Sequence, residues 1–125
     1  MKISGEKEKP ARGELLDAAF DIVRRYIEFR EYGSKDKALK ALAKRCEGFS
    51  ARQYDNAFEK GVSLLTASIK FVDEKKEMFW QRFREHEPEL KFEGFEAEVR
   101  ESCPGFNTST YRAALNWAFF WHHLK

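Results

Sequence analysis

The sequence predicts an all-α protein of about six helices, and three observations lead to this class. Apolar residues recur at spacings of three and four along most of the 125-residue chain, which is the period of a helix with one buried face. Glycines and N-capping residues such as serine stand at the ends of these stretches. No segment alternates apolar and polar residues for long enough to predict a strand. We therefore expect a single helical domain over residues 13–125, preceded by a polar segment at residues 1–12.

The first helix is expected over residues 13–32. Gly33 follows it and can adopt the left-handed backbone conformation that ends a helix. Spacings of three and four place seven apolar residues on one side of this helix. They are Leu15, Leu16, Ala19, Ile22, Val23, Tyr26 and Ile27.

Two N-caps mark the next two helices. Ser34 is expected to cap a helix over residues 35–46, which Gly48 ends. Ser50 and Gln53 have the spacing of a capping box and open a third helix. The inward face of this third helix is expected to consist of Tyr54, Ala57, Phe58, Gly61, Val62, Leu65, Ile69 and Val72.

The residues after Asp73 allow two interpretations. No glycine or proline follows until Pro88, so a single helix could run through residues 51–87. A break near Asp73 is favoured, because helices in globular proteins average about 12 residues.

Two further helices complete the expected set. Apolar residues at four-residue spacing from Phe95 to Cys103 predict a short helix, which Pro104 and the glycine after it end. Asn107 or Thr108 then caps a final helix that runs to the C-terminal end of the sequence.

An internal repeat is the most informative feature of the sequence. Residues 46–58 recur 57 positions later as residues 103–115, and five of the 13 positions are identical: a cysteine, a glycine, a phenylalanine, a tyrosine and an alanine. Each of these has a packing role at the corner between two helices. The repeat predicts two related three-helix units, residues 13–72 and 73–125, packed against each other with pseudo-twofold symmetry.

Charge and composition exclude several classes of protein. The 23 basic and 21 acidic side chains leave a net charge of +2, which by itself does not indicate a nucleic-acid partner. No apolar run approaches the roughly 20 residues that span a bilayer, and the first residues lack the apolar segment of a secretory signal. The two cysteines are too few for a disulfide scaffold and suit small apolar fillers of the two corners. We expect a cytoplasmic protein with no membrane contact.

The sequence predicts no catalytic, cofactor or metal site. His122 and His123 are adjacent, so on a helix they point about 100° apart and cannot readily share a metal. His86 lies between two glutamates and is expected to face solvent. There is no HExxH motif, no glycine-rich phosphate loop and no nucleophile at a recognised spacing from a base. We therefore expect a protein that is not an enzyme and needs no cofactor.

The final helix is the candidate interaction site. One apolar stripe, which includes Tyr111, suffices to pack it on its own corner, and a second stripe lies about 125° around the helix. The second stripe consists of Trp117, Phe120, Trp121 and Leu124. It predicts an interface with a protein partner or a second copy of the chain. Alternatively, this stripe docks inside the chain on the first helix, near Ile22 and Tyr26.

A nucleic-acid-binding module is the alternative function. The two corners resemble a helix-turn-helix, in which the second helix enters the major groove. The candidate contacts are Arg52, Gln53, Asn56, Lys60, Arg112 and Asn116. Asp55 and Glu59 lie among them and would repel phosphate, so protein interaction is the preferred hypothesis.

Overall fold

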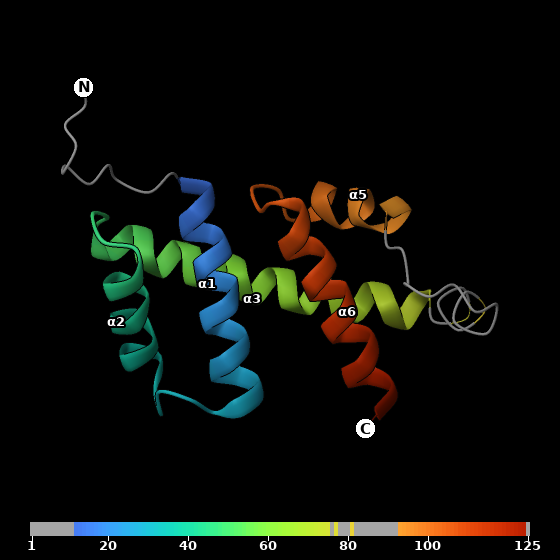
Figure 1. The fold of residues 1–125 in the computed structure, drawn as a ribbon, viewed down its shortest axis with the longest axis horizontal. Coiled ribbons are helices and arrows are strands. Elements are labelled where there is room, and N and C mark those ends of the chain that lie inside the picture. The colour runs from blue at the N-terminus through green and yellow to red at the C-terminus, as the bar shows by residue number, and fades with distance from the viewer. Residues whose placement is uncertain (1–11, 76, 78–80, 82–92, 125) are drawn as a thin grey trace.

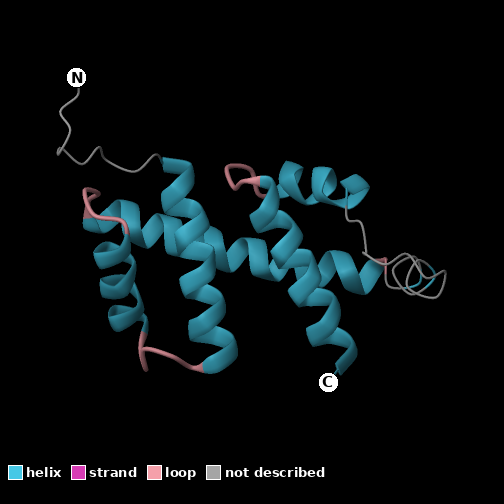
Figure 2. Cartoon of the chain, in the orientation of Figure 1, coloured by secondary structure: helices cyan, strands magenta, loops and turns pink. Residues whose placement is uncertain are grey.

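The computed structural model describes residues 12–75, 77, 81 and 93–124, with the side-chain surroundings of all of these except residues 12, 13, 93, 94 and 120–124. The described residues form five helices and no strand, so the all-α class is confirmed (Figure 2). The helices are α1 (Arg12–Phe29), α2 (Lys35–Arg45), α3 (Ala51–Glu74), α5 (Glu93–Ser102) and α6 (Thr108–Leu124).

The longest helix, α3, organises the molecule. It runs along the long axis, with α1 and α6 crossing it, α2 beside α1 at one end, and α5 beside its other half (Figure 1). The buried face of α3 is wider than the predicted stripe, because Leu64, Ser68 and Phe71 are buried as well. A single apolar stripe is wide enough to pack against one neighbouring helix. Helix α3 packs against every other described helix and therefore needs a wider apolar face.

The crossing of α1 over α3 depends on Gly61. A Cβ atom at this position would lie 3.0 Å from Val23 Cγ2 and 3.3 Å from the carbonyl oxygen of Ala19. The absence of a side chain therefore lets the two helix backbones approach closely. Farther along α1, the rings of Tyr26 and Phe58 pack with their centroids 6.0 Å apart.

The end of α1 differs from the prediction. The helix ends at Phe29, three residues before the expected end, and Arg30 adopts the left-handed conformation with φ of 58°. The backbone N–H of Glu31 donates to the carbonyl of Arg25 at 3.2 Å and so satisfies one of the last carbonyls of the helix. Gly33 is left-handed as expected, but it lies inside the turn and does not end the helix.

The predicted N-caps of α2 and α3 are confirmed. The Ser34 hydroxyl accepts from the backbone N–H of Lys37 at 3.2 Å, and Ser50 and Gln53 form both hydrogen bonds of a capping box. Helix α3 ends at Glu74, where the sequence favoured a break. Most of the helix expected next, within residues 76–87, lies outside the described residues, so the predicted count of six helices is not confirmed.

Within the described part of the chain, no helix is both long enough and apolar enough to cross a bilayer.

Asp21 joins α1 to α2 through a cluster of arginines. Its carboxylate accepts from Arg45 at 2.6 Å and from Arg25 at 3.1 Å, and it lies 3.7 Å from Arg24. Partial burial alone would raise the pKa of Asp21. The hydrogen bonds and charges of Arg45 and Arg25 outweigh that effect and hold the pKa below its ordinary value of 3.8.

Replacing Asp21 by Asn tests this cluster. Because the folded-state pKa is depressed, the cluster stabilises the fold above about pH 4, and this stabilisation is lost as the pH falls through the folded-state pKa. We expect Asp21→Asn to lower the free energy of unfolding by about 0.5–1 kcal/mol at neutral pH, a small effect because the pair is solvent-screened. Urea unfolding at about pH 7 and about pH 2 measures this, and the difference from the wild type should close in acid. Glu47→Gln, an exposed control in the turn after α2, should have no effect at either pH, and a difference that persists in acid would contradict the assignment.

Candidate interaction surfaces

The corner between α2 and α3 is held by a tyrosine hydroxyl. Tyr54 donates to the carbonyl of Cys46 at 2.6 Å and accepts from the backbone N–H of Phe49 at 3.2 Å. Its ring also packs edge-on against Phe49, with the centroids 5.9 Å apart. Gly48 makes the turn with φ of 106°, which a residue with a side chain rarely adopts.

The corner between α5 and α6 repeats these contacts. Tyr111 donates to the carbonyl of Cys103 at 2.5 Å and accepts from the N–H of Phe106 at 3.3 Å. The Phe106 and Tyr111 rings also meet edge-on, 5.8 Å apart, and Gly105 has φ of 107°. Each residue of the sequence repeat therefore has the same local role at both corners.

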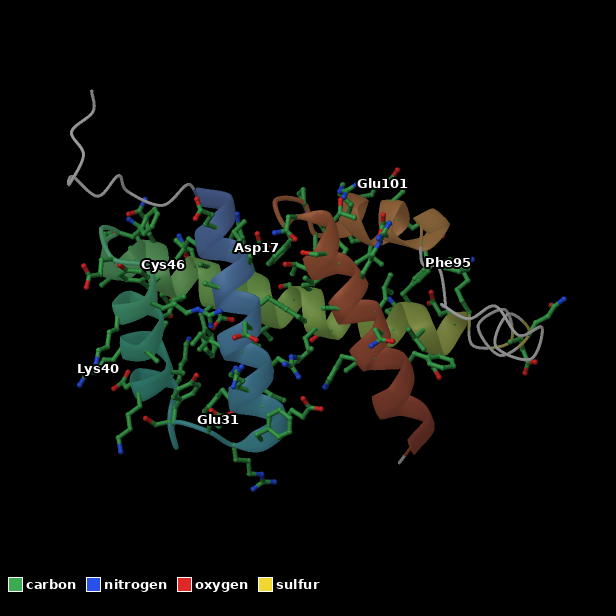
Figure 3. The ribbon with its side chains drawn as sticks, in the orientation of Figure 1. Asp17, Glu31, Lys40, Cys46, Phe95 and Glu101 are labelled. Carbon is green, nitrogen blue, oxygen red and sulfur yellow. The ribbon has the colours of Figure 1, made fainter. Side chains whose placement is uncertain are left out.

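The two corners differ in how the N-cap residue is bound. The N–H of Ser50 donates to the side chain of Gln53 at 2.8 Å. The position equivalent to Gln53 is occupied by Thr110, which lacks the amide oxygen that closes a capping box. Asp17 of α1 supplies the acceptor instead, and binds the N–H of Asn107 at 3.0 Å and its side-chain amide at 2.7 Å (Figure 3).

Helix α1 also covers the second corner with apolar side chains. Phe20 meets Phe106 edge-on at 6.5 Å, and a Cβ on Gly105 would lie 2.7 Å from Leu16 Cδ1. Phe106 is consequently buried, with 7% of its surface exposed. Phe49, its equivalent at the first corner, is only half-buried.

The two cysteines lie inside the corners, as the sequence predicted. Cys46 and Cys103 are free and buried. Burial raises the pKa of both thiols, which lowers their thiolate fraction and hence their reactivity. They are small apolar fillers of the two turns.

The candidate nucleic-acid contacts of the first corner lie on the exposed side of α3. Arg52, Asn56 and Lys60 are all solvent-exposed. Gln53 is exposed too, but its side-chain oxygen is engaged in the capping box. A small hollow of about 20 Å³ separates Gln53, Asn56 and Lys60 from Leu15 at the start of α1.

The two acidic residues among these contacts share one lysine, which leaves a net charge of −1 over the three side chains. Lys35 of α2 binds Asp55 at 3.1 Å and Glu59 at 2.7 Å. Both carboxylates are therefore drawn toward α2, which weakens the repulsion of phosphate expected from the sequence.

The second corner offers fewer free contacts. Arg112 donates to the carboxylate of Glu96 at 2.9 Å, and Glu96 is buried. Its charge is thus committed within the chain, while Asn116 is exposed on α6. The structure does not bring these two residues together with the candidates on α3 into one basic surface.

The second apolar stripe of α6 is described only at its first residue. Trp117 is half-buried and packs against the core. The side chains of Phe120, Trp121 and Leu124 lie outside the described residues, although the backbone there continues as helix. The first stripe is buried as expected, with Tyr111 fully enclosed.

An apolar surface that the sequence analysis missed lies at the end of α1. Ile27 and Phe29 are the exposed large hydrophobic residues of the described part, with 46% and 58% of their surface exposed. The assignment of Ile27 to the buried stripe is therefore wrong. The physical reason is that α1 extends past its crossing with α3 (Figure 1), and the part of the chain that the structure describes leaves Ile27 and Phe29 largely uncovered there. Helical periodicity gives the direction of a side chain but not the length of the neighbouring helix.

Among the described residues, no group of three or more His, Cys, Asp or Glu side chains lies close enough to hold a metal ion. His86 and the side chains of His122 and His123 lie outside the described residues. No family model, curated protein or solved structure matches this chain. Its function is therefore inferred from its own surfaces.

The two corner phenylalanines provide a matched pair of substitutions. Phe106→Ala removes a buried ring that contacts α1, and we expect it to lower the free energy of unfolding by about 3–4 kcal/mol. Phe49→Ala removes a half-buried ring, and about 1–2 kcal/mol is expected. Urea unfolding at neutral pH measures both. Equal losses would contradict the conclusion that α1 covers only the second corner.

Proposed function

We propose that this chain is a non-enzymatic interaction module that associates with a second copy of itself through the end of α1. The surface consists of Ile27, Phe29, Arg30 and Tyr32, and is called the turn surface below. The exposure of Ile27 and Phe29 is the observation that carries the proposal. The cytoplasmic location expected from the sequence belongs to the same proposal, and the free, buried cysteines suit a reducing compartment.

The exposure of these residues has an energetic cost. Single apolar residues on a surface are common. Ile27 and Phe29 are two residues apart in α1, so they point about 200° apart and are two separate exposed side chains near one end of the helix. Burying them in an interface would recover free energy at roughly 25 cal/mol for each Å² removed from water.

Backbone strain at the same place supports a functional role. Arg30 and Tyr32 have φ of 58° and 73°. Left-handed conformations cost residues with side chains about 1–2 kcal/mol each. Strain that persists in a folded protein is concentrated at functional sites, and these two residues directly follow the exposed Phe29.

The charges around the turn surface favour a second copy as the partner. Arg24 binds Glu28 at 2.9 Å, and Arg25 lies 3.7 Å from Glu31. In a twofold contact, the charged side chains around the surface of one copy lie opposite the same side chains of the other copy. Because these arginines and glutamates are already paired within each chain, such a contact avoids like-charge repulsion. Arg30 adds one cation around the same surface.

The second apolar stripe of α6 is included in the proposed interface. Helices α1 and α6 both end at the same edge of the molecule (Figure 1). Trp117, Phe120, Trp121 and Leu124 would extend the apolar area beyond what two side chains provide, toward the roughly 800 Å² that each partner buries in a stable complex.

We also propose that the two corners are copies of one duplicated unit, as the sequence repeat predicts. The matched hydrogen bonds of Tyr54 and Tyr111 and the matched φ angles of Gly48 and Gly105 support this. Under the 57-residue offset, α2 corresponds to α5 and α3 to α6.

Phe29→Ser tests the turn surface. In about 0.5 M NaCl, the wild type is expected to be a dimer at micromolar concentration in analytical ultracentrifugation, and the variant a monomer, because the most exposed large apolar side chain of the described residues has been removed. The thermal melt of the variant at low concentration should change little, since Phe29 is 58% exposed and loses a surface contact with Arg24, whose guanidinium carbon lies 5.9 Å from the ring centroid. Trp121→Ala tests the contribution of α6 in the same way.

Ala97→Ser, an exposed change on α5, is the matched control and should remain dimeric. A monomeric wild type, or a Phe29→Ser variant with unchanged affinity, would overturn the proposed function.

Nucleic-acid binding is the second candidate. The ion pairs of Lys35 with Asp55 and Glu59 favour it, because they reduce the repulsion of phosphate at the first corner. If it is correct, duplex DNA should bind with micromolar or tighter affinity and with a steep salt dependence in a fluorescence anisotropy titration. The double variant Arg52→Glu, Lys60→Glu should abolish this binding. Weak binding that this variant leaves unchanged would exclude the first corner as a nucleic-acid site.

A further inference from the structure

The two helices that correspond under the repeat carry opposite charge. Helix α2 has four lysines and Arg45 against one acid, Asp36. Helix α5 has four glutamates against one base, Arg100. If the charged side chains of α2 and α5 served only to keep the protein in solution, the two helices would not need net charges of opposite sign. Their opposite charges therefore indicate that the two helices face different surroundings.

The basic charge of α2 is concentrated on one outward face. Lys37, Lys40 and Lys44 are spaced by three and four residues, which places them in one row, and all three are exposed. None of them forms an ion pair with the residues that the structure describes, whereas Lys35 and Arg45 are bound to acidic side chains. Lys40 points away from the body of the molecule (Figure 3).

The acidic helix borders a groove. Helices α3 and α5 enclose an open groove of about 430 Å³, whose apolar lining comes from Ala67, Phe71 and Val99. The ammonium group of Lys75 lies over the Phe71 ring, 5.9 Å from its centroid. The groove therefore already holds one lysine against its apolar lining in the way that lysine side chains cover apolar surface.

The rim of this groove carries three acidic and two basic side chains, a net charge of −1. Glu74, Glu98 and Glu101 line it, together with Lys70 and Lys75. Glu98 and Glu101 are exposed and are spaced by three residues, so they lie on one side of α5. Figure 3 shows Glu101 at the outer side of α5.

We propose that α2 of one copy docks in the groove between α3 and α5 of another copy. The lysine row would pair with Glu98, Glu101 and Glu74, and the lysine stems would cover the apolar lining. The two surfaces cannot meet within one chain, because α2 packs at the start of α3 and the groove lies along its end, and the 24 residues of α3 span about 36 Å.

This contact is heterologous: each copy offers one basic and one acidic surface, so association continues from copy to copy. It does not rest on the turn surface, which is apolar and would form a closed dimer. The two contacts also differ in their response to salt. Exposed charge pairs are screened at high ionic strength, whereas apolar burial is not weakened by salt.

The experiment measures the size of the assembly by sedimentation velocity at about 50 mM and about 0.5 M NaCl. We expect the wild type to form species larger than a dimer at low salt and to lose them at high salt. Reversal of the basic face by Lys40→Glu with Lys44→Glu should weaken the low-salt association roughly tenfold or more. Reversal of the acidic face by Glu98→Lys with Glu101→Lys should have the same effect.

The decisive test is the mixture of the two reversed variants. The new acidic face of one variant matches the new basic face of the other, so the large species should reappear on mixing. Arg52→Glu with Lys60→Glu makes the same change in net charge as the α2 reversal but on the exposed side of α3, and should leave the assembly intact.

Three results would overturn the proposal: a wild type without salt-sensitive assembly, a mixture that does not reassemble, or a control that dissociates as readily as the α2 variant. Loss of DNA binding by the α2 variant without any self-association would assign the lysine row to nucleic acid instead.

Phe29→Ser separates this contact from the turn surface. It should still form salt-sensitive assemblies even if it abolishes the dimer, and if it removes every species the two contacts are not independent and the proposal fails.

Discussion

The close crossing of α1 over α3 at Gly61 is the constraint on which the rest of the structure depends. Because no side chain separates the two backbones, Ala19 and Val23 of α1 are fully buried against α3. This position of α1 determines what its other faces can reach. One side meets α2 through Asp21, and another meets the turn before α6 through Asp17 and Phe20. A bulky residue at the crossing would displace α1 from both neighbours together.

The same geometry explains why the molecule has both closed and open surfaces. Helix α1 extends beyond its crossing with α3 (Figure 1). Its first half is largely buried, whereas Ile27 and Phe29 near its end are exposed. The enclosed half covers one of the two corners, and Phe106 is buried as a result, while Phe49 keeps part of its surface exposed. Surfaces left open in this way are available for other molecules without any change in the core.

Local features of the fold could be read from the sequence, whereas contacts between distant elements could not. The caps at Ser34 and Ser50 and the repeated corners follow from short-range chemistry, since the cap bonds join residues three apart and the corner bonds join residues five or eight apart. The acceptor role of Asp17 has no local signal, because its partner lies 90 residues away. The exposure of Phe29 and the burial of Ser68 depend on where neighbouring helices begin and end, and that is decided by tertiary packing.

The unequal capping of the two corners imposes an order on the formation of the fold. The cap of α3 closes over three residues, from Ser50 to Gln53, so it can form as soon as that stretch of chain is helical. At α6 the side chain of Asn107 caps the helix locally by accepting from the N–H of Thr110 at 2.8 Å, but the N–H of Asn107 itself is bound to Asp17 across 90 residues. Loop closure over that separation is entropically unfavourable until α1 is held in place by other contacts. The start of α6 therefore gains its acceptor late and loses it early when the chain opens locally. During synthesis from the N-terminus, α1, α2 and α3 can pack first and serve as the template onto which the second corner assembles.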